Sequence, residues 1–158
     1  MIKTNVMRIL DKNKIEYKVH DYSSYGFTNG EEIAKFLNQD PKNVFKTLIT
    51  RGKSKEYYVF MIPVDKELDL KKCALSVNEK SIEMIHQKEL FPLTGYIHGG
   101  CSPLGMKKEF KTVIDESILN IDIIYFSAGK VGYQIEMNKD LLSNALNYEL
   151  YNLIKLNN

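Results

Sequence analysis

The sequence predicts an α+β fold, in which helices and short strands mix without the strict alternation of a parallel sheet. Two observations favour it: short apolar runs bounded by turn-forming residues recur along the chain, and helix-start signals lie between them. The 158 residues contain no internal repeat, low-complexity tract or Pro/Gly linker, so we expect a single domain, residues 1–158. We expect its strands to curl into a barrel-like sheet.

The first expected elements are a helix and a strand. Thr4 is a favourable N-cap residue, and Val6, Ile9 and Leu10 behind it would share one face of the helix. A strand is expected at Glu16–Tyr22, where the alternation of residues favours an extended chain.

Two further helix starts follow. Thr28-Asn-Gly-Glu31 has the spacing of a capping box and predicts a helix that bears Ile33, Phe36 and Leu37. Asp40-Pro41 places a proline at the first position of another helical turn.

The middle of the chain predicts a hairpin. Val44–Thr50 and Tyr57–Pro63 are expected strands, and Gly52–Lys55 is the turn between them. Asp69 is expected to cap a short helix, and a short strand is expected at Ser81–Ile85.

The second half of the chain begins with a helical turn at His86–Leu93, which we expect Pro92 and Gly95 to end. Three strands are then expected, at Thr112–Ile114, Ile123–Phe126 and Tyr133–Met137. Asn138 is expected to cap a last helix with an apolar stripe formed by Leu141, Leu142, Ala145, Leu146, Leu150, Leu153 and Ile154.

Composition narrows the class of protein. No run reaches the ~18 apolar residues of a membrane helix, and the N-terminus lacks a signal peptide, so we expect a cytoplasmic protein. The net charge is +2, and Arg8 and Arg51 are the only arginines, which does not suit the reading of a DNA sequence. Cys73 and Cys101 are expected to be free, buried or partly buried thiols.

Standard catalytic motifs are absent from the sequence. His20, His86 and His98 are scattered, so neither a metal nor another cofactor is expected.

One candidate for chemistry is Lys46, which interrupts the apolar strand Val-Phe-Lys-Thr-Leu-Ile. Its ammonium group points either to solvent from a half-exposed sheet or into a cleft, where it would hold a phosphate or polarise a carbonyl.

Two glycine-rich segments are the other candidates. The segment Gly95–Gly105 is either an ordinary turn-rich connection or a loop whose backbone N–H groups bind a ligand. Ser127–Gly132, taken alone, is typical of a hairpin turn.

Together these segments resemble the YbaK/EbsC family of aminoacyl-tRNA deacylases. The matching stretches are Val44-Phe-Lys-Thr-Leu48, Gly95-Tyr-Ile-His-Gly-Gly-Cys-Ser-Pro-Leu-Gly105, Tyr125-Phe-Ser-Ala-Gly-Lys-Val-Gly132, Leu68–Lys72 and Lys12–Ile15. Each is weak alone, but their order and spacing are similar to the family from end to end. The chain looks most like the YbaK branch, which removes cysteine from mischarged proline tRNA.

The resemblance implies a mixed fold with a mostly antiparallel, barrel-like sheet flanked by helices. It also implies mischarged tRNA as substrate, prolyl-tRNA synthetase as partner, and a pocket between the Lys46 strand and the glycine-rich loop. By the same resemblance Lys46 is the catalytic residue, and the substrate-binding residues are Tyr22, Thr47, Gly99, Gly100, Ser102, Pro103, Ser127 and Gln134.

The chain departs from the YbaK branch at Gln134, where that branch has an acidic residue. An amide donates and accepts hydrogen bonds but cannot act as a base or carry charge. The amino-acid specificity therefore stays open between cysteine and another residue such as alanine, and a non-catalytic module that binds tRNA or a synthetase is a further alternative.

Hydrolysis of an aminoacyl ester passes through an oxyanion, which we expect Lys46 and the N–H groups near Gly99 to stabilise jointly. Lys46 could instead hold the terminal phosphate or ribose. No Ser–His or Cys–His pair is evident, and the resemblance implies that the thiol of a cysteinyl substrate attacks its own carbonyl. Cys101 is not expected to be the nucleophile, because the family motif does not require cysteine there.

Overall fold

The computed structural model describes residues 2–156, and in them the strands form two open sheets. The helices are α1 (Asn5–Lys12), α2 (Gly30–Phe36), α3 (Leu70–Ser76) and α4 (Gln87–Thr94). The strands are β1 (Tyr17–Asp21), β2 (Phe45–Gly52), β3 (Tyr57–Pro63), β4 (Ile82–Met84), β5 (Lys111–Asp115), β6 (Ile123–Ser127), β7 (Tyr133–Asn138) and β8 (Glu149–Tyr151). The α+β class is confirmed, whereas the barrel-like sheet is not.

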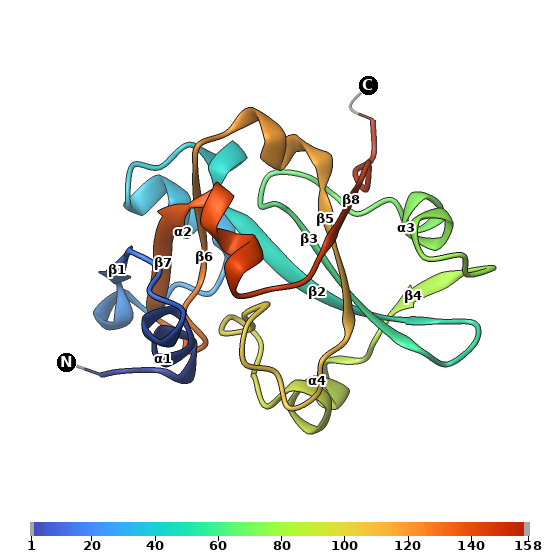
Figure 1. Cartoon of the computed structure of the whole chain (residues 1–158), viewed down its shortest axis with the longest axis horizontal. Coiled ribbons are helices and arrows are strands. Elements are labelled where there is room, and N and C mark those ends of the chain that lie inside the picture. The colour runs from blue at the N-terminus through green and yellow to red at the C-terminus, as the bar shows by residue number, and fades with distance from the viewer. Residues whose placement is uncertain (1, 157–158) are drawn as a thin grey trace.

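The smaller sheet has the order β1-β7-β6, and both of its pairings are antiparallel. The larger sheet has the order β4-β2-β3-β5-β8. Its β2 pairings are antiparallel, but β5 pairs in parallel with both β3 and β8. A bridge between Val44 and Tyr125 joins the two sheets, and Figure 1 shows β2 running through the middle of the molecule beside β6.

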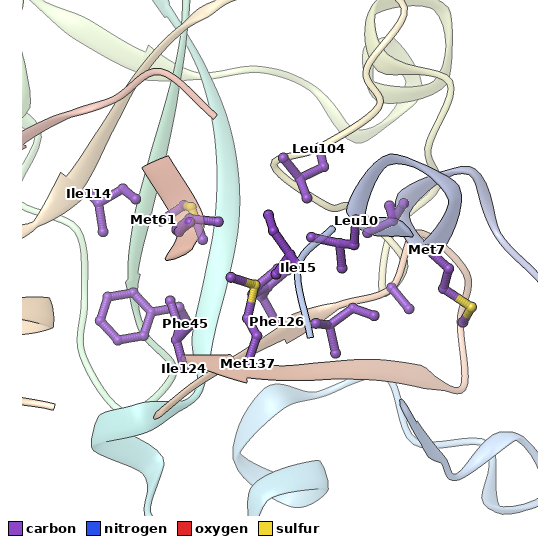
Figure 2. Close-up of a cluster of buried hydrophobic side chains, with 14 of the residues drawn as sticks. Met7, Leu10, Ile15, Phe45, Met61, Leu104, Ile114, Ile124, Phe126 and Met137 are labelled. Carbon is purple, nitrogen blue, oxygen red and sulfur yellow. The ribbon is translucent and has the colours of Figure 1, made fainter. Parts of the chain in front are cut away.

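Two clusters of apolar side chains lie on opposite faces of the larger sheet. Phe45 and Met61 face the first cluster, which also takes in α1, β6 and β7 (Figure 2). Phe60 and Ile62 face the second cluster, which packs beneath α3. Because successive strand residues point to opposite faces, β3 is buried on both sides and β2 is held rigidly beside it.

The cap signals of the sequence are largely confirmed. Thr4 accepts a hydrogen bond from the backbone N–H of Met7 (3.3 Å), and Asp69 caps α3 through the N–H of Lys71 (3.0 Å). Asp40 caps a short 3-10 helix, Pro41–Asn43, by accepting from Lys42 N–H (3.0 Å).

The capping box at residues 28–31 is wrong by one position. Asn29, not Thr28, caps α2, because its Oδ1 accepts from the N–H groups of Glu31 (2.8 Å) and Glu32 (3.3 Å).

Pro92 does not end the helix before Gly95. It lies inside α4, where the N–H of Gly95 still reaches the carbonyl of Phe91 (2.8 Å). Gly95 ends the helix, with a φ of 84° that favours glycine.

The prediction of a helix after Asn138 is also wrong. Only a 3-10 helix forms, Lys139–Asn144, and the chain then extends into β8. The reason lies in tertiary contacts: the buried carboxylate of Asp115 accepts from the N–H of Leu153 (2.9 Å), and Leu153 is fully buried in the second cluster. Pairing with β5 thus outweighs the helical pattern of the leucines.

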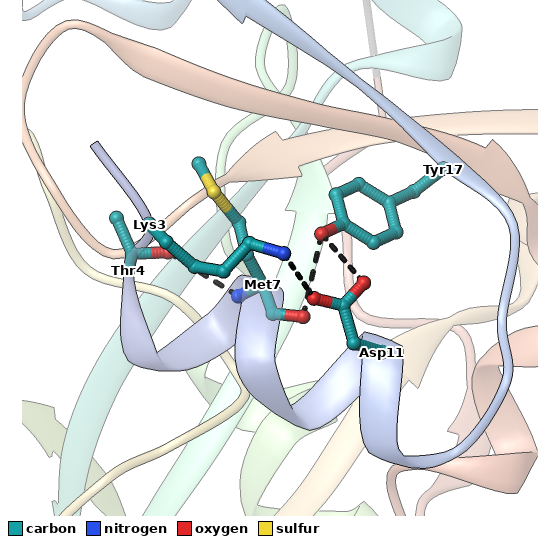
Figure 3. A network of polar contacts seen from close by, with 5 residues as sticks. All are labelled: Lys3, Thr4, Met7, Asp11 and Tyr17. Atoms are coloured by element: carbon teal, nitrogen blue, oxygen red, sulfur yellow. Dashed lines mark hydrogen bonds and ion pairs between the residues drawn. The ribbon is translucent and has the colours of Figure 1, made fainter. Parts of the chain in front are cut away.

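A polar network joins α1 to β1 (Figure 3). Asp11 accepts from the Tyr17 hydroxyl (2.9 Å) and pairs with Lys3. The hydrogen bond from Lys3 lowers the pKa of Asp11, and burial together with Asp11 raises the pKa of Tyr17 to about 12.

Candidate active site

A cavity of about 600 Å³ is bordered by β2, the start of α2, α4, the glycine-rich loop and the ends of β6 and β7. Its size is within the range of small-molecule sites. Six of the residues expected from the sequence lie on its lining: Tyr22, Lys46, Thr47, Gly99, Ser127 and Gln134.

Lys46 lies on β2 and is half-buried at the cavity. By strand alternation it shares a face with Val44, which packs against Ala34 of α2 and Val64. Within residues 2–156 its ammonium group forms no ion pair, and Glu31 is the acidic residue on the cavity lining. The ammonium group is therefore free to meet a ligand.

Gly99 brings the glycine-rich loop to the cavity. Its φ of 86° is one that residues with a side chain rarely adopt, and a Cβ there would lie 3.1 Å from the side chain of Thr28. The loop is closed on itself by the N–H of Gly100, which bonds to the carbonyl of Ile97 (3.0 Å). A backbone approach to a ligand is thus possible at Gly99 because no side chain intervenes.

Tyr22, directly after β1, and Ser127, at the end of β6, lie on the wall formed by the smaller sheet and the chain next to it. Tyr22 is 3% exposed, and burial raises the pKa of its hydroxyl. Ser127 Oγ accepts from the N–H of Gly129 (3.1 Å), which holds the turn before β7.

Gln134 is 3% exposed and makes two reciprocal hydrogen bonds with Gln39, a residue that sequence reasoning missed. Gln39 Nε2 donates to Gln134 Oε1 (2.7 Å), and Gln134 Nε2 donates to Gln39 Oε1 (3.0 Å). This wall of the cavity therefore carries a fixed, uncharged amide.

Thr47 lies on the cavity lining, but its hydroxyl is not exposed there. Its Oγ1 is shielded from solvent and has no hydrogen-bond partner within residues 2–156. An unpaired buried hydroxyl costs free energy. A substrate contact through Oγ1 therefore requires the neighbouring groups to move.

The structure does not bring Gly100, Ser102 and Pro103 onto the cavity lining. All three are buried in the loop, and Ser102 Oγ lies 3.5 Å from the N–H of Leu104, which it accepts from. Gly100 allows the loop to pack closely, because a Cβ there would meet the backbone of Val131 at 3.0 Å.

Cys101 does lie on the lining, as a half-buried free thiol. Burial raises its pKa to about 12, so the nucleophilic thiolate is scarce at neutral pH. Cys73 is fully buried, as expected, and lies in the second cluster.

Several lining residues were missed from the sequence, among them Asn29, Ile85 and Gln87. Asn29 and Gln87 reach the cavity at the starts of α2 and α4, and Ile85 reaches it after β4, where its N–H bonds to the carbonyl of Ile49 (3.4 Å). A single sequence carries no local signal for this tertiary packing. In residues 2–156, no three His, Cys, Asp or Glu side chains gather as a metal site would need, and no helix has the length and apolarity to cross a bilayer.

Residues 27–144 match the sequence model of the aminoacyl-tRNA editing domain family, and the chain belongs to that family. A protein of Enterococcus faecalis with the provisional name Cys-tRNA(Pro)/Cys-tRNA(Cys) deacylase EbsC is 41% identical over 146 residues, which cover 92% of this chain and 89% of that protein. The family resemblance found in the sequence is confirmed.

More distant relatives include proline–tRNA ligases. The enzyme of Brachyspira hyodysenteriae is 28% identical over 90 residues, which are 57% of this chain but only 16% of the ligase. The chain thus matches a small part of those enzymes.

Solved structures show the same fold. The crystal structure of hypothetical protein APE2540 superposes with a TM-score of 0.88 at 20% identity, covering 96% of this chain and 100% of that one. The crystal structure of a provisionally assigned trans-editing enzyme for prolyl-tRNA synthetase gives a TM-score of 0.81 at 18% identity, covering 98% and 100%.

Proposed function

We propose that this chain is a trans-editing hydrolase that cleaves the ester of mischarged Cys-tRNA(Pro). The observation that supports the proposal is that Lys46 and the backbone of Gly99 line one cavity, in a chain 41% identical to a protein provisionally named as a deacylase of this substrate. We propose that residues 1–158 act as one editing domain.

The proposed role of Lys46 is electrostatic. The ester carbonyl gains negative charge on its oxygen when it is attacked, and a cation and an N–H group fixed nearby stabilise that charge. Lys46 supplies the cation, and the backbone at Gly99 supplies the N–H. Gripping the terminal phosphate or ribose is the alternative role for Lys46.

The proposed nucleophile belongs to the substrate. The thiol sulfur of the cysteinyl group attacks its own carbonyl carbon and forms a C–S bond, the bond to the ribose oxygen breaks, and the thiol proton passes to that oxygen. Water then opens the resulting thiolactone and releases cysteine. The raised pKa of Cys101 supports this scheme, because the cavity offers no ready protein thiolate.

We propose Tyr22, Ser127 and Gln134 as substrate contacts on the opposite wall, formed by the smaller sheet and the chain next to it. The formal charge of +2 gives little unaided affinity for RNA, so we propose that prolyl-tRNA synthetase delivers the tRNA in the cytoplasm. Pull-down with the synthetase, with and without tRNA, tests this partner; failure to bind in both cases would exclude it.

Gln134 favours one second candidate, a deacylase for another amino acid on proline tRNA, such as alanine. The test is to measure cleavage of Cys-tRNA(Pro) and Ala-tRNA(Pro) by the wild-type chain. Faster loss of the cysteinyl ester supports our proposal, and faster loss of the alanyl ester supports the second candidate. Binding of both tRNAs without cleavage of either would identify a non-catalytic module.

A further inference from the structure

The pairing of Gln39 with Gln134 is reciprocal: each amide both donates to and accepts from the other (2.7 and 3.0 Å). A primary amide has two N–H donors and an oxygen with two lone pairs. The pairing uses one donor and one lone pair of Gln134. One N–H and one lone pair are left over, on a residue that lines the cavity.

Both partners are held by their backbones. Gln134 lies on the central strand of the smaller sheet, opposite His20 on β1 and Ser127 on β6. Gln39 follows the end of α2, where Asn38 has a φ of 56° and the N–H of Gln39 reaches back to the carbonyl of Ala34 (2.8 Å). This C-terminal capping arrangement fixes where the Gln39 side chain starts.

We infer that Gln39 is a positioning residue for substrate selection: it fixes the orientation of the Gln134 amide, so that the cavity presents a neutral wall with one N–H and one oxygen to the aminoacyl group. The inference rests on the proposed function.

The chemistry of the pair explains why an amide suits position 134. A carboxylate there could accept from Gln39 Nε2, but it could not donate to Gln39 Oε1, which would then face a negative charge at about 3 Å. With Gln39 in place, an acid at position 134 is disfavoured. The cavity then carries the charges of Lys46 and Glu31 without a further carboxylate at this wall.

The first test is steady-state kinetics of Gln39→Ala on Cys-tRNA(Pro) and Ala-tRNA(Pro). Without its partner the Gln134 amide must be ordered by the substrate, so KM should rise about three- to tenfold, the usual effect of immobilising one side chain, while kcat stays within about twofold. The preference between the two esters should fall by a similar factor.

Asn43→Ala is the matched control. Asn43 Nδ2 donates to the carbonyl of Ile123 (2.8 Å), so it fastens the same segment to the same sheet without lining the cavity. A merely structural role for Gln39 would make the two variants alike. Equal KM and equal ester preference in Gln39→Ala, Asn43→Ala and wild type would overturn the inference.

Rescue gives a second test. Gln134→Glu alone should weaken binding of the aminoacyl-tRNA substrate. Gln39→Lys together with Gln134→Glu should recover part of that binding, because the lysine ammonium group can form an ion pair with the new carboxylate. The fold-loss in substrate affinity of the double variant should be at least about threefold smaller than the product of the fold-losses of the two single variants. Independent effects would contradict the pairing.

Binding of an amide-linked alanyl-adenosine, measured by calorimetry, separates this inference from the proposed function. A wild-type chain that cleaves no ester would refute the proposed function alone. Weaker binding of this analogue to Gln39→Ala than to Asn43→Ala would still support the inference. Equal binding to both variants, or no binding to the wild type, would refute it.

Discussion

Lys46 and Gly99 border the same cavity, although Lys46 lies on the interior strand β2 and Gly99 lies in the irregular loop after α4. The strand is held by apolar packing on both faces of its sheet. The loop is held by the hydroxyl of Tyr96, which donates to the carbonyl of Leu104. A cation on a well-packed strand and a peptide group without side-chain bulk thereby line the same cavity.

Gly99→Ala should impair both stability and activity. The left-handed conformation costs a residue with a Cβ about 1–2 kcal/mol, and the Cβ would also press on Thr28 at 3.1 Å, a residue of the cavity lining. Gly26→Ala is the control, since Gly26 has a φ of 70° but open space around it. Urea unfolding and deacylation assays on both variants should show a stability loss in each, but an activity loss only at Gly99. An equal activity in the two variants would remove the role of the Gly99 backbone.

Cys101→Ser should keep the deacylase rate within a few-fold of wild type. Burial holds the pKa of the thiol at about 12, so at pH 7 it is almost entirely protonated and is a poor nucleophile. Alkylation of Cys101 by iodoacetamide should be slow for the same reason. Loss of turnover in the serine variant, with an unchanged unfolding curve, would make Cys101 part of the chemistry.

Tyr96→Phe should loosen the glycine-rich loop. The carbonyl of Leu104 would lose its donor inside the protein, which costs about 1–3 kcal/mol. Burial raises the pKa of Tyr96 from 10.0 to about 12, so its contribution to stability is full below pH 10 and is lost as the pH rises toward 12. The free energy of unfolding, measured from pH 8 to 12, should therefore fall less steeply with pH in the variant than in the wild type.

Tyr17→Phe is the control for that experiment. The pKa of Tyr17 is also about 12, but its hydroxyl bonds to Asp11 away from the cavity. Tyr17→Phe should likewise make the free energy of unfolding fall less steeply at alkaline pH, but it should leave the deacylation rate unchanged. Tyr96→Phe, by contrast, should also slow deacylation because it loosens the loop that borders the cavity. Equal deacylation rates in the two variants would contradict the link between Tyr96 and the loop.

The sequence identified the elements whose signals are local. Strand β2 and the Asp69 cap follow from apolar runs and capping residues a few positions apart. The prediction of a C-terminal helix was wrong, because the leucine pattern competes with backbone pairing to β5, and no local pattern encodes that pairing. Gln39 was missed because its partner is distant in the sequence. Ser102 was assigned to the cavity by the family resemblance, but a matching motif does not say which way the side chain points, and Ser102 lies off the cavity lining.

Asp115→Ala should detach the C-terminal segment that was expected to be helical. Asp115 is 1% exposed, and its carboxylate accepts from the N–H groups of Leu153 (2.9 Å) and Ser117 (3.2 Å). Leaving both donors unpaired should cost about 2–4 kcal/mol. Asp40→Ala removes an exposed cap and should cost about 1 kcal/mol. Hydrogen exchange should show faster exchange at Glu149–Tyr151 only in the Asp115 variant; protection unchanged there would refute the anchor.

The most direct measurement is single-turnover cleavage of Cys-tRNA(Pro) by the wild type and by Lys46→Ala, with Lys42→Ala, an exposed lysine outside the cavity lining, as the control. Removing the cation should slow cleavage about 10²–10³-fold while leaving the unfolding curve unchanged, and Lys42→Ala should cleave like the wild type. Wild-type rates in Lys46→Ala would contradict the account.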